Sequence, residues 1–318
     1  PGTEGEQTSL RAAISIANKL NSPRIVFDIP GGGTPKIALS NALPSIIGSM
    51  SIDGRTQPGT GRICVDGSGL GANADGFAIF SGQVSLHGLE VVRFSRLGIV
   101  LAGGSGHEIT ACSIGTNQAG ASGLGNGFGL VVQNLTGVTI GGAGPGEQNV
   151  ISGNGNGVEL INCQQVDLLH NYIGTAPNGS TPLANTNRGL NVDGAVNLTI
   201  GSNADVSVIS GSVLAGRLEQ VNGLSIMRTN FGVGLDGTTF PAGQQEGIFI
   251  LNSQNIDFKD CTAGGFNNGP TIGFVGCHSV KINRSRIGVS GDGSTALPSF
   301  FGIRAFNCQN VLIGTRSE

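Results

Sequence analysis

Tryptophan is absent from this 318-residue chain, tyrosine occurs once, and charged residues make up only 12%. Average globular proteins contain about 25% charged residues. The formal net charge is −3, so the chain lacks the basic stripe with which proteins attract nucleic acids. No apolar run reaches the roughly 18 residues that a membrane-spanning helix requires. We therefore expect neither a nucleic-acid partner nor a membrane span.

Paired cysteine motifs are also lacking. The six cysteines never occur as Cys-x-x-Cys, which argues against a zinc ribbon and against a redox motif. No signal peptide precedes Pro1, and nothing else in the chain is typical of a cytoplasmic protein. We therefore expect a mature or trimmed protein that is extracellular or attached to a cell surface.

Glycine, by contrast, is abundant. It accounts for 56 residues, while 38% of the chain is hydrophobic. Disordered chains are poor in apolar residues, so this composition indicates a folded protein. A fold that needs glycine at many regular turns fits both numbers.

A repeat of strand pairs runs through most of the chain. Eight repeats begin at residues 98, 129, 157, 189, 215, 247, 271 and 302. Four positions in each repeat are apolar in nearly every copy, and the alternation between them has the period of two that is typical of strands. One row in the first strand is Leu101, Val132, Leu160, Val192, Leu218, Ile250, Phe274 and Ala305. One row in the second strand is Ile109, Ile140, Leu168, Ile200, Ile226, Phe258, Ile282 and Ile313. Two further rows begin at Ile99 and His107.

The turn between the two strands has its own pattern. Its first position is almost always Asn or Gly, the residues that adopt the left-handed conformation most easily. The row is Gly103, Asn134, Asn162, Gly194, Gln220, Asn252, Gly276 and Asn307. This pattern predicts a left-handed kink that lets the chain turn a corner between the strands.

A third short strand follows in each coil. In the long coils it is seen at Ser113-Ile114-Gly115, Tyr172-Ile173-Gly174, Asn230-Phe231-Gly232 and Arg286-Ile287-Gly288, each before a glycine-rich loop. The sequence therefore predicts an all-β, right-handed, single-stranded parallel β-helix. We expect three strands per coil, about nine to eleven coils, and a spacing of about 4.8 Å between coils.

The N-terminal segment differs from the repeats. We expect Thr8 to cap a helix over 9–20, followed by a strand over 25–29 and shorter strands near 37–39, 50–52 and 63–65. This helix is predicted to cover the open end of the stack, where apolar core and strand edges would otherwise be exposed. We assign residues 1–50 to this cap and 51–318 to the β-helix, as one continuous domain.

Part of the cap resembles a known family. Ser9 to Ile14 read Ser-Leu-Arg-Ala-Ala-Ile, which is similar to the Ser-Leu-Arg-Glu-Ala-Ile segment at the start of many bacterial right-handed β-helix repeat proteins. Thr8 stands where that family often has Cys, and Ala12 where it has Glu. Asn-Tyr-Ile-Gly-Thr at 171–175 and Asn-Val-Ile-Ser-Gly-Asn at 149–154 resemble its long-coil and short-coil signatures. The resemblance implies a secreted or surface-attached β-helix. This fold also carries polysaccharide lyases, hydrolases, phage spikes and adhesins, so it does not fix the activity.

Candidate catalytic residues do not converge. Glycoside hydrolysis needs two neighbouring carboxylates, and Asp-Asp does not occur in the chain. Glu159 and Arg217 face outward two coils apart, about 10 Å from each other by strand spacing; we interpret them as a solvated surface, with a site as the alternative. His107 stands in an aliphatic row and is interpreted as a core histidine. Aromatic side chains that would stack on sugars are scarce.

Three Asp-Gly loops resemble parts of calcium loops. They are 66–68, 236–238 and 292–294. They lack the ligand number of a calcium site, and Asp-Gly is primarily a turn sequence. Cys163, Cys277 and Cys308 share one small corner position and are interpreted as buried thiols, with a Cys277–Cys308 disulfide as the alternative. We predict no catalytic residue, no cofactor and no metal.

The sequence favours a non-catalytic role without settling whether the protein is an enzyme. The first hypothesis is a secreted or cell-surface structural, adhesive or self-assembling β-helix, with glycans as further partners. The alternatives are a polysaccharide lyase or glycoside hydrolase of the pectate-lyase-like type, and a trimeric phage-type spike. Val100, Val131 and Phe249 would form the outward apolar stripe that a spike needs. The last coil ends after Ile313 without a third strand or cap, which predicts self-association through that coil.

Overall fold

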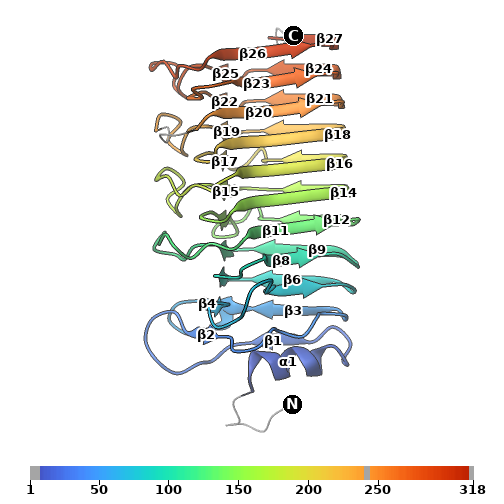
Figure 1. Ribbon diagram of the computed structural model, residues 1–318, viewed down its shortest axis with the longest axis vertical. Helices are drawn as coiled ribbons and strands as arrows, with labels where there is room; N and C mark the ends of the chain where they lie inside the picture. Colours follow the sequence, from blue (N-terminus) through green and yellow to red (C-terminus); the bar gives the residue numbers. More distant parts are fainter. Residues whose placement is uncertain (1–7, 240–243, 315–318) are drawn as a thin grey trace.

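The computed structural model describes residues 8–239 and 244–314. These residues form an all-β parallel solenoid of about ten turns with very little helix. Figure 1 shows the turns stacked along one axis, with α1 (Leu10–Ala17) at one end and the last two strands at the other. A single short 3-10 turn in this described part, Gly54–Thr56, follows the third strand.

The larger sheet holds 17 strands, and every strand pair in it is parallel. It contains two strands from most turns. In turns near the middle of the stack these two run together as one long strand, such as β14. The strands are β1 (Arg24–Val26), β3 (Met50–Asp53), β5 (Phe77–Ile79), β6 (Val84–His87), β8 (Leu97–Leu101), β9 (Ser105–Thr110), β11 (Phe128–Gln133), β12 (Thr136–Ile140), β14 (Asn156–Leu168), β16 (Arg188–Ile200), β18 (Leu214–Met227), β20 (Glu246–Leu251), β21 (Gln254–Lys259), β23 (Pro270–Val275), β24 (His278–Asn283), β26 (Phe301–Phe306) and β27 (Gln309–Ile313).

In the described residues the smaller sheet holds ten parallel strands, one from each turn except the last, to which β26 and β27 belong. They are β2 (Lys36–Ala38), β4 (Ile63–Asp66), β7 (Leu89–Val92), β10 (Ser113–Ile114), β13 (Asn149–Ile151), β15 (Asn171–Ile173), β17 (Ser207–Ile209), β19 (Thr229–Phe231), β22 (Thr262–Ala263) and β25 (Arg286–Ile287). Long loops leave this sheet and return to the larger one, and they project on one side of the stack in Figure 1. The smaller sheet therefore lies beside the loops, where a ligand could be enclosed.

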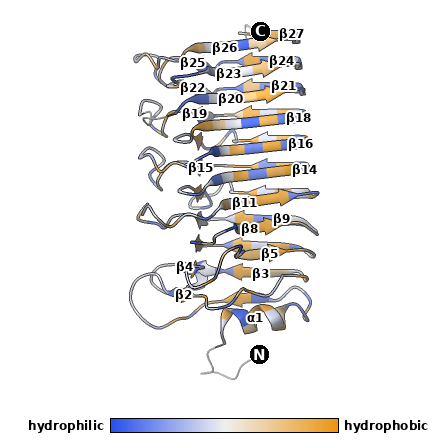
Figure 2. Cartoon of the chain, in the orientation of Figure 1, coloured by the Kyte–Doolittle hydropathy of each residue, from blue (hydrophilic) through white to orange (hydrophobic). Residues whose placement is uncertain are grey.

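The register confirms the predicted apolar rows. Leu101 pairs with Val132, which pairs with Leu160, and the same row continues to Ala305. Within the stack these inward side chains are 0–3% exposed, because each is covered by its counterparts in the turns on either side. Figure 2 shows hydrophobic and hydrophilic bands alternating along β14, β16 and β18. The core is thus a set of apolar columns parallel to the solenoid axis.

The predicted left-handed kink is present in seven of the eight repeats, from Asn134 (φ 56°) to Asn307 (φ 51°). In the first repeat Gly104 adopts the left-handed conformation (φ 87°) in place of Gly103. A second left-handed position, three residues further on, was not predicted. Its row is Gly106, Gly137, Gln165, Asn197, Gly223, Asn255, Ser279 and Asn310. Two left-handed residues, three apart in seven repeats and two apart in the first, redirect the chain between the two strands of each repeat.

Buried asparagines connect the turns at the ends of the smaller sheet. Asn154 Oδ1 accepts hydrogen bonds from the backbone N–H and the Nδ2 of Asn126, both at 3.0 Å. Asn185 Oδ1 accepts the same two bonds from Asn154, at 3.0 and 3.1 Å. The Nδ2 of each also bonds a backbone carbonyl, such as Ile114 O for Asn154. We call Asn126, Asn154 and Asn185 the asparagine stack; it satisfies backbone groups that the strands leave unpaired.

The N-terminal helix begins one residue later than predicted. Ser9, not Thr8, is its N-cap, and the Ser9 hydroxyl accepts a hydrogen bond from the Ala12 N–H. The helix ends at Ala17 rather than at residue 20, and the predicted strand 25–29 is shortened to β1. The apolar face of α1 is buried as expected, because Leu10, Ile14 and Ala17 are at most 5% exposed. Two expectations concern residues outside the described ranges. One is the mature or trimmed start at Pro1, and the other is the lack of a third strand or cap after Ile313.

All six cysteines are free. Cys163 and Cys277 occupy the predicted corner position, are 1% exposed, and donate their thiol protons to backbone carbonyls such as Val132 O and Ile250 O. Burial raises the pKa of both thiols. They therefore act as small packing groups, and the alternative of a Cys277–Cys308 disulfide is not observed.

His107 is a buried core histidine whose protonation state is fixed by its partners. Its Nδ1 accepts a hydrogen bond from the Val84 N–H at 3.1 Å, and its Nε2 lies 2.9 Å from Gly103 O. A carbonyl only accepts, so Nε2 carries the proton and the ring is neutral. Burial lowers the pKa of His107, and burial also lowers the pKa of His87, which contacts Thr110.

We expect acid to destabilise the fold through these histidines. Between the lowered folded-state pKa and the ordinary value of about 6.5, the unfolded chain binds more protons than the folded one. The free energy of unfolding should therefore be constant above about pH 6.5 and decrease as the pH falls through that value. Urea unfolding from pH 7.5 to 5 measures this. The slope should be smaller in His107→Val than in the unmodified protein. An unchanged slope in this variant would contradict the assignment.

Candidate functional site

The structure places the outward residues singled out in the sequence on two strands that are not neighbours. Glu159 and Arg217 are separated by Asn191, which lies between them in the register. Asn191 Nδ2 donates to Glu159 Oε1 at 3.4 Å, while the Arg217 guanidinium pairs with Glu219 on its own strand. Glu159 and Arg217 therefore have different partners, Asn191 and Glu219.

The apolar stripe expected for a spike is also largely covered. Val100 is 5% exposed and Val131 is 7% exposed, although both alternate outward. They were wrongly interpreted as an exposed contact stripe, because outward residues of the larger sheet are covered in this part of the stack. Phe249 alone of the three is half-buried, beside a small cavity of about 170 Å³ lined by Gly273, Arg304 and Phe306 among others.

The three Asp-Gly loops use their carboxylates for turns and ion pairs. Asp236 accepts hydrogen bonds from the N–H groups of Thr238 and Thr239, and Asp292 accepts one from the Ser294 N–H. Partial burial opposes the change, but the hydrogen bond from the Thr239 hydroxyl and these N–H bonds lower the pKa of Asp236. The Ser290 and Ser294 hydroxyls lower the pKa of Asp292. No cluster of three or more His, Cys, Asp or Glu side chains fit to hold a metal is found in the described residues.

Other carboxylates are held by basic side chains. Asp66 is buried and pairs with Lys36 and Arg93. These cations and the Ser68 N–H outweigh burial and hold the pKa of Asp66 far below its ordinary value. Further pairs are Asp53 with Arg24 and Arg55, Asp75 with Arg96, and Asp260 with Arg284. Most of these pairs join neighbouring turns, so the acidic groups stabilise the stack.

The last turn exposes residues that are buried elsewhere. Ile313 is 54% exposed, whereas Ile282, its neighbour in the same inward row, is 3% exposed. Within the described residues, β26 and β27 pair only with β23 and β24. Five of the exposed large apolar side chains lie on this turn: Phe300, Phe301, Phe306, Leu312 and Ile313. In the described part of the chain, this end therefore presents apolar side chains and strand edges that pair with no further strand.

The opposite end also carries exposed apolar side chains. Ile16 and Leu20 on and after α1, Val26 on β1, and Ile47 are 44–59% exposed. Together with the five on the last turn, they are nine of the thirteen large apolar side chains exposed in the described chain. The apolar surface is thus concentrated at the two ends of the solenoid, which we call the cap end and the open end.

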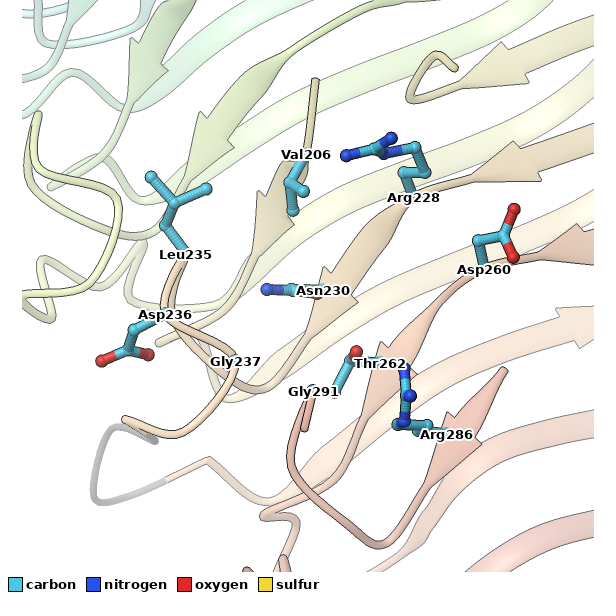
Figure 3. A pocket seen from close by; sticks show the side chains of 10 residues that line it. All are labelled: Val206, Arg228, Asn230, Leu235, Asp236, Gly237, Asp260, Thr262, Arg286 and Gly291. Atoms are coloured by element: carbon cyan, nitrogen blue, oxygen red, sulfur yellow. The ribbon is translucent and has the colours of Figure 1, made fainter. Parts of the chain in front are cut away.

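A groove lies on the smaller sheet, near the open end. It has a volume of about 330 Å³ and is open to solvent. Its floor comes from three consecutive turns, since Asn230 pairs with Thr262 and Thr262 pairs with Arg286. Arg228 and Asp260 border the floor just before β19 and β22, as Figure 3 shows. We call this the loop groove.

Two loops form the outer wall of the loop groove. Leu235 to Gly237 follow β19, and Gly291 follows β25. The Gly291 N–H donates to Gly237 O at 3.1 Å, and the Leu235 N–H donates to Gly179 O at 2.8 Å. Each loop is therefore bonded to the next one along the stack. In Figure 3 the carboxylate of Asp236 points away from Asn230 and Thr262.

The sequence analysis predicted no groove here. It did assign Asn230 and Arg286 to the third strands of two long coils, and both lie on strands of the smaller sheet. Thr262 was missed because its turn has no comparable signature. Arg228 and Asp260 were missed because they are corner residues, and the loops that close the groove have no periodic pattern.

No family model and no curated protein matches the chain. Several solved structures are similar to it. The A-module of a mannuronan C-5 epimerase from Azotobacter vinelandii is 8% identical, covers 97% of this chain and 92% of its own, and has a TM-score of 0.46. A surface protein and adhesin of Streptococcus pneumoniae is 9% identical, covers 96% and 95%, and has a TM-score of 0.26. In the described residues, no helix is long and apolar enough to cross a membrane.

Proposed function

We propose that this protein is a secreted or cell-surface, non-catalytic β-helix that assembles with copies of itself. In this proposal the solenoid is right-handed, has three strands per coil, and is capped by α1 over its first turn. Cap and coils form one domain, which is supported by a single apolar core that runs from Leu10 to Ile282. The ion pairs of Asp53, Asp66, Asp75 and Asp260 with basic side chains, most of which join neighbouring turns, support a structural role.

The exposed open end is the observation that carries the proposal. An inward row that is 0–3% exposed through the stack becomes 54% exposed at Ile313. Unpaired edges and apolar surface favour addition of a further strand-bearing partner. Because the cap end carries the second group of exposed apolar side chains, the open end of one copy is proposed to stack on the cap end of the next. Such a head-to-tail contact repeats and produces filaments.

Negative-stain electron microscopy and sedimentation test the assembly. Filaments are expected for the unmodified protein. Ile313→Lys at the open end and Leu20→Lys at the cap end should each block filament growth, since either places a charge in the contact. Val196→Lys is the matched control, because Val196 is 40% exposed in the middle of the stack and its variant should still form filaments.

Mixing the two blocked variants tests the polarity of the contact. Ile313→Lys keeps its cap end and Leu20→Lys keeps its open end, so an equimolar mixture should form dimers that do not grow. Monomers of the unmodified protein at all concentrations would overturn the assembly proposal. Dimers formed by Leu20→Lys alone would overturn the head-to-tail arrangement.

A further inference from the structure

We propose that the loop groove binds an oligosaccharide that carries carboxylate or sulfate groups. This inference does not depend on self-assembly. It rests on the position of Arg228, Asn230, Thr262 and Arg286 along one face of the smaller sheet, and on the loops that enclose them.

Several polar groups of the groove have no partner in the described part of the protein. No hydrogen bond is formed by Thr262 Oγ1, by Asn230 Oδ1 or by the Arg286 guanidinium there, and Arg228 makes one, to Asn203 O at 3.2 Å. Asn230 and Thr262 are each 7% exposed. None of these atoms is among the fully buried polar atoms without a partner in the described residues, so they are open to solvent, and a ligand in the groove can bond to them in place of water.

The arrangement of charges favours an anion. Asp260 is neutralised by Arg284, whose Nε and Nη2 lie 2.7 and 2.6 Å from its two carboxylate oxygens. This bidentate bond lowers the pKa of Asp260. Asp236 is engaged in its own turn and faces away from the floor. Arg228 and Arg286 form no ion pair in the described residues, although the charge of Arg228 also acts on Asp260. Guanidinium binds carboxylate and sulfate strongly.

The other lining groups fit a sugar better than a small inorganic ion. The floor offers an amide, a hydroxyl and a guanidinium at the spacing of adjacent strands, about 4.8 Å. A ligand with regularly placed hydroxyl and acidic groups can bond to all three at once. Val206 and Leu235 add apolar surface, against which the C–H face of a sugar ring can pack. The volume of about 330 Å³ lies at the lower end of the range for ligand sites, and the open sides let a longer chain continue.

Calorimetric titration with defined oligosaccharides tests the assignment. The probes are trigalacturonate for carboxylates, a sulfated chondroitin disaccharide for sulfates, neutral maltotriose, and inorganic sulfate. We expect at least one acidic sugar to bind at least about tenfold more tightly than maltotriose and than inorganic sulfate. Which acidic probe binds more tightly identifies the group. Affinity should fall with added salt.

Variants locate the binding site. Arg286→Gln and Arg228→Gln should each weaken binding about tenfold or more, and Thr262→Val should weaken it without changing the salt dependence. Arg188→Gln is the matched control, since Arg188 is an exposed arginine on the other sheet, and it should bind as the unmodified protein does. Three results would each overturn the inference. Inorganic sulfate could bind as tightly as the acidic sugars, neither acidic sugar could bind, or neither Arg228→Gln nor Arg286→Gln could weaken binding. Arg286→Gln should still form filaments in electron microscopy. A loss of sugar binding in this variant can then be distinguished from a loss of assembly.

Discussion

Replacing Asn154 with alanine is expected to lower the free energy of unfolding by about 3–6 kcal/mol. Asn154 is fully buried and is the middle member of the asparagine stack. Its removal takes the acceptor from the Asn126 N–H and Nδ2, and the donor from Ile114 O. Each buried polar group that loses its partner costs about 1–3 kcal/mol, and the removed side chain leaves a polar void between turns.

Urea denaturation measures this loss as a shift of the midpoint. Asn187→Ala is the matched control, because Asn187 lies two residues beyond Asn185 in the same region but is exposed. It should change the free energy of unfolding by less than about 0.5 kcal/mol, as surface substitutions generally do. If the two variants were equally stable, the stack would be an incidental contact rather than a support of the fold.

The apolar rows were predictable because they depend on the strand period alone. The rows through Leu101 and Ile109 need no knowledge of the loops, since an alternation of two fixes which side chains face inward. The left-handed kink was predictable for the same reason, because Asn134 and its counterparts recur at a fixed place. The helix boundary was less certain in the sequence, since Thr8 and Ser9 are both good caps and only the backbone path selects Ser9.

Contacts between turns were not predictable from the sequence. Asn154 belongs to a recognised short-coil signature, but its bonds to Asn126 and Asn185 depend on how three separate turns stack. The loop groove could not be predicted for the same reason. Arg228, Asp260 and Arg286 come from three consecutive turns, and their meeting depends on the lengths and bonding of loops that follow no period.

The second large effect is expected at Gly174, where substitution by alanine should cost about 2–5 kcal/mol. Gly174 follows β15 and has φ of +85°. A Cβ there would lie 1.8 Å from the backbone oxygen of Ser210 in the next turn. The left-handed conformation costs a non-glycine residue roughly 1–2 kcal/mol, and forcing extra volume into a packed contact costs typically about 1–3 kcal/mol more.

Gly59→Ala separates the two contributions. Gly59 has nearly the same φ, +80°, but no atom lies within 4 Å of its hypothetical Cβ. This variant should therefore lose only the conformational part, about 1–2 kcal/mol, in thermal or urea unfolding. Equal losses in the two variants would show that the turns can separate enough to admit a methyl group. A larger loss at Gly174 would show that close stacking of turns, and not the local backbone alone, requires the glycine of the Tyr-Ile-Gly-Thr signature.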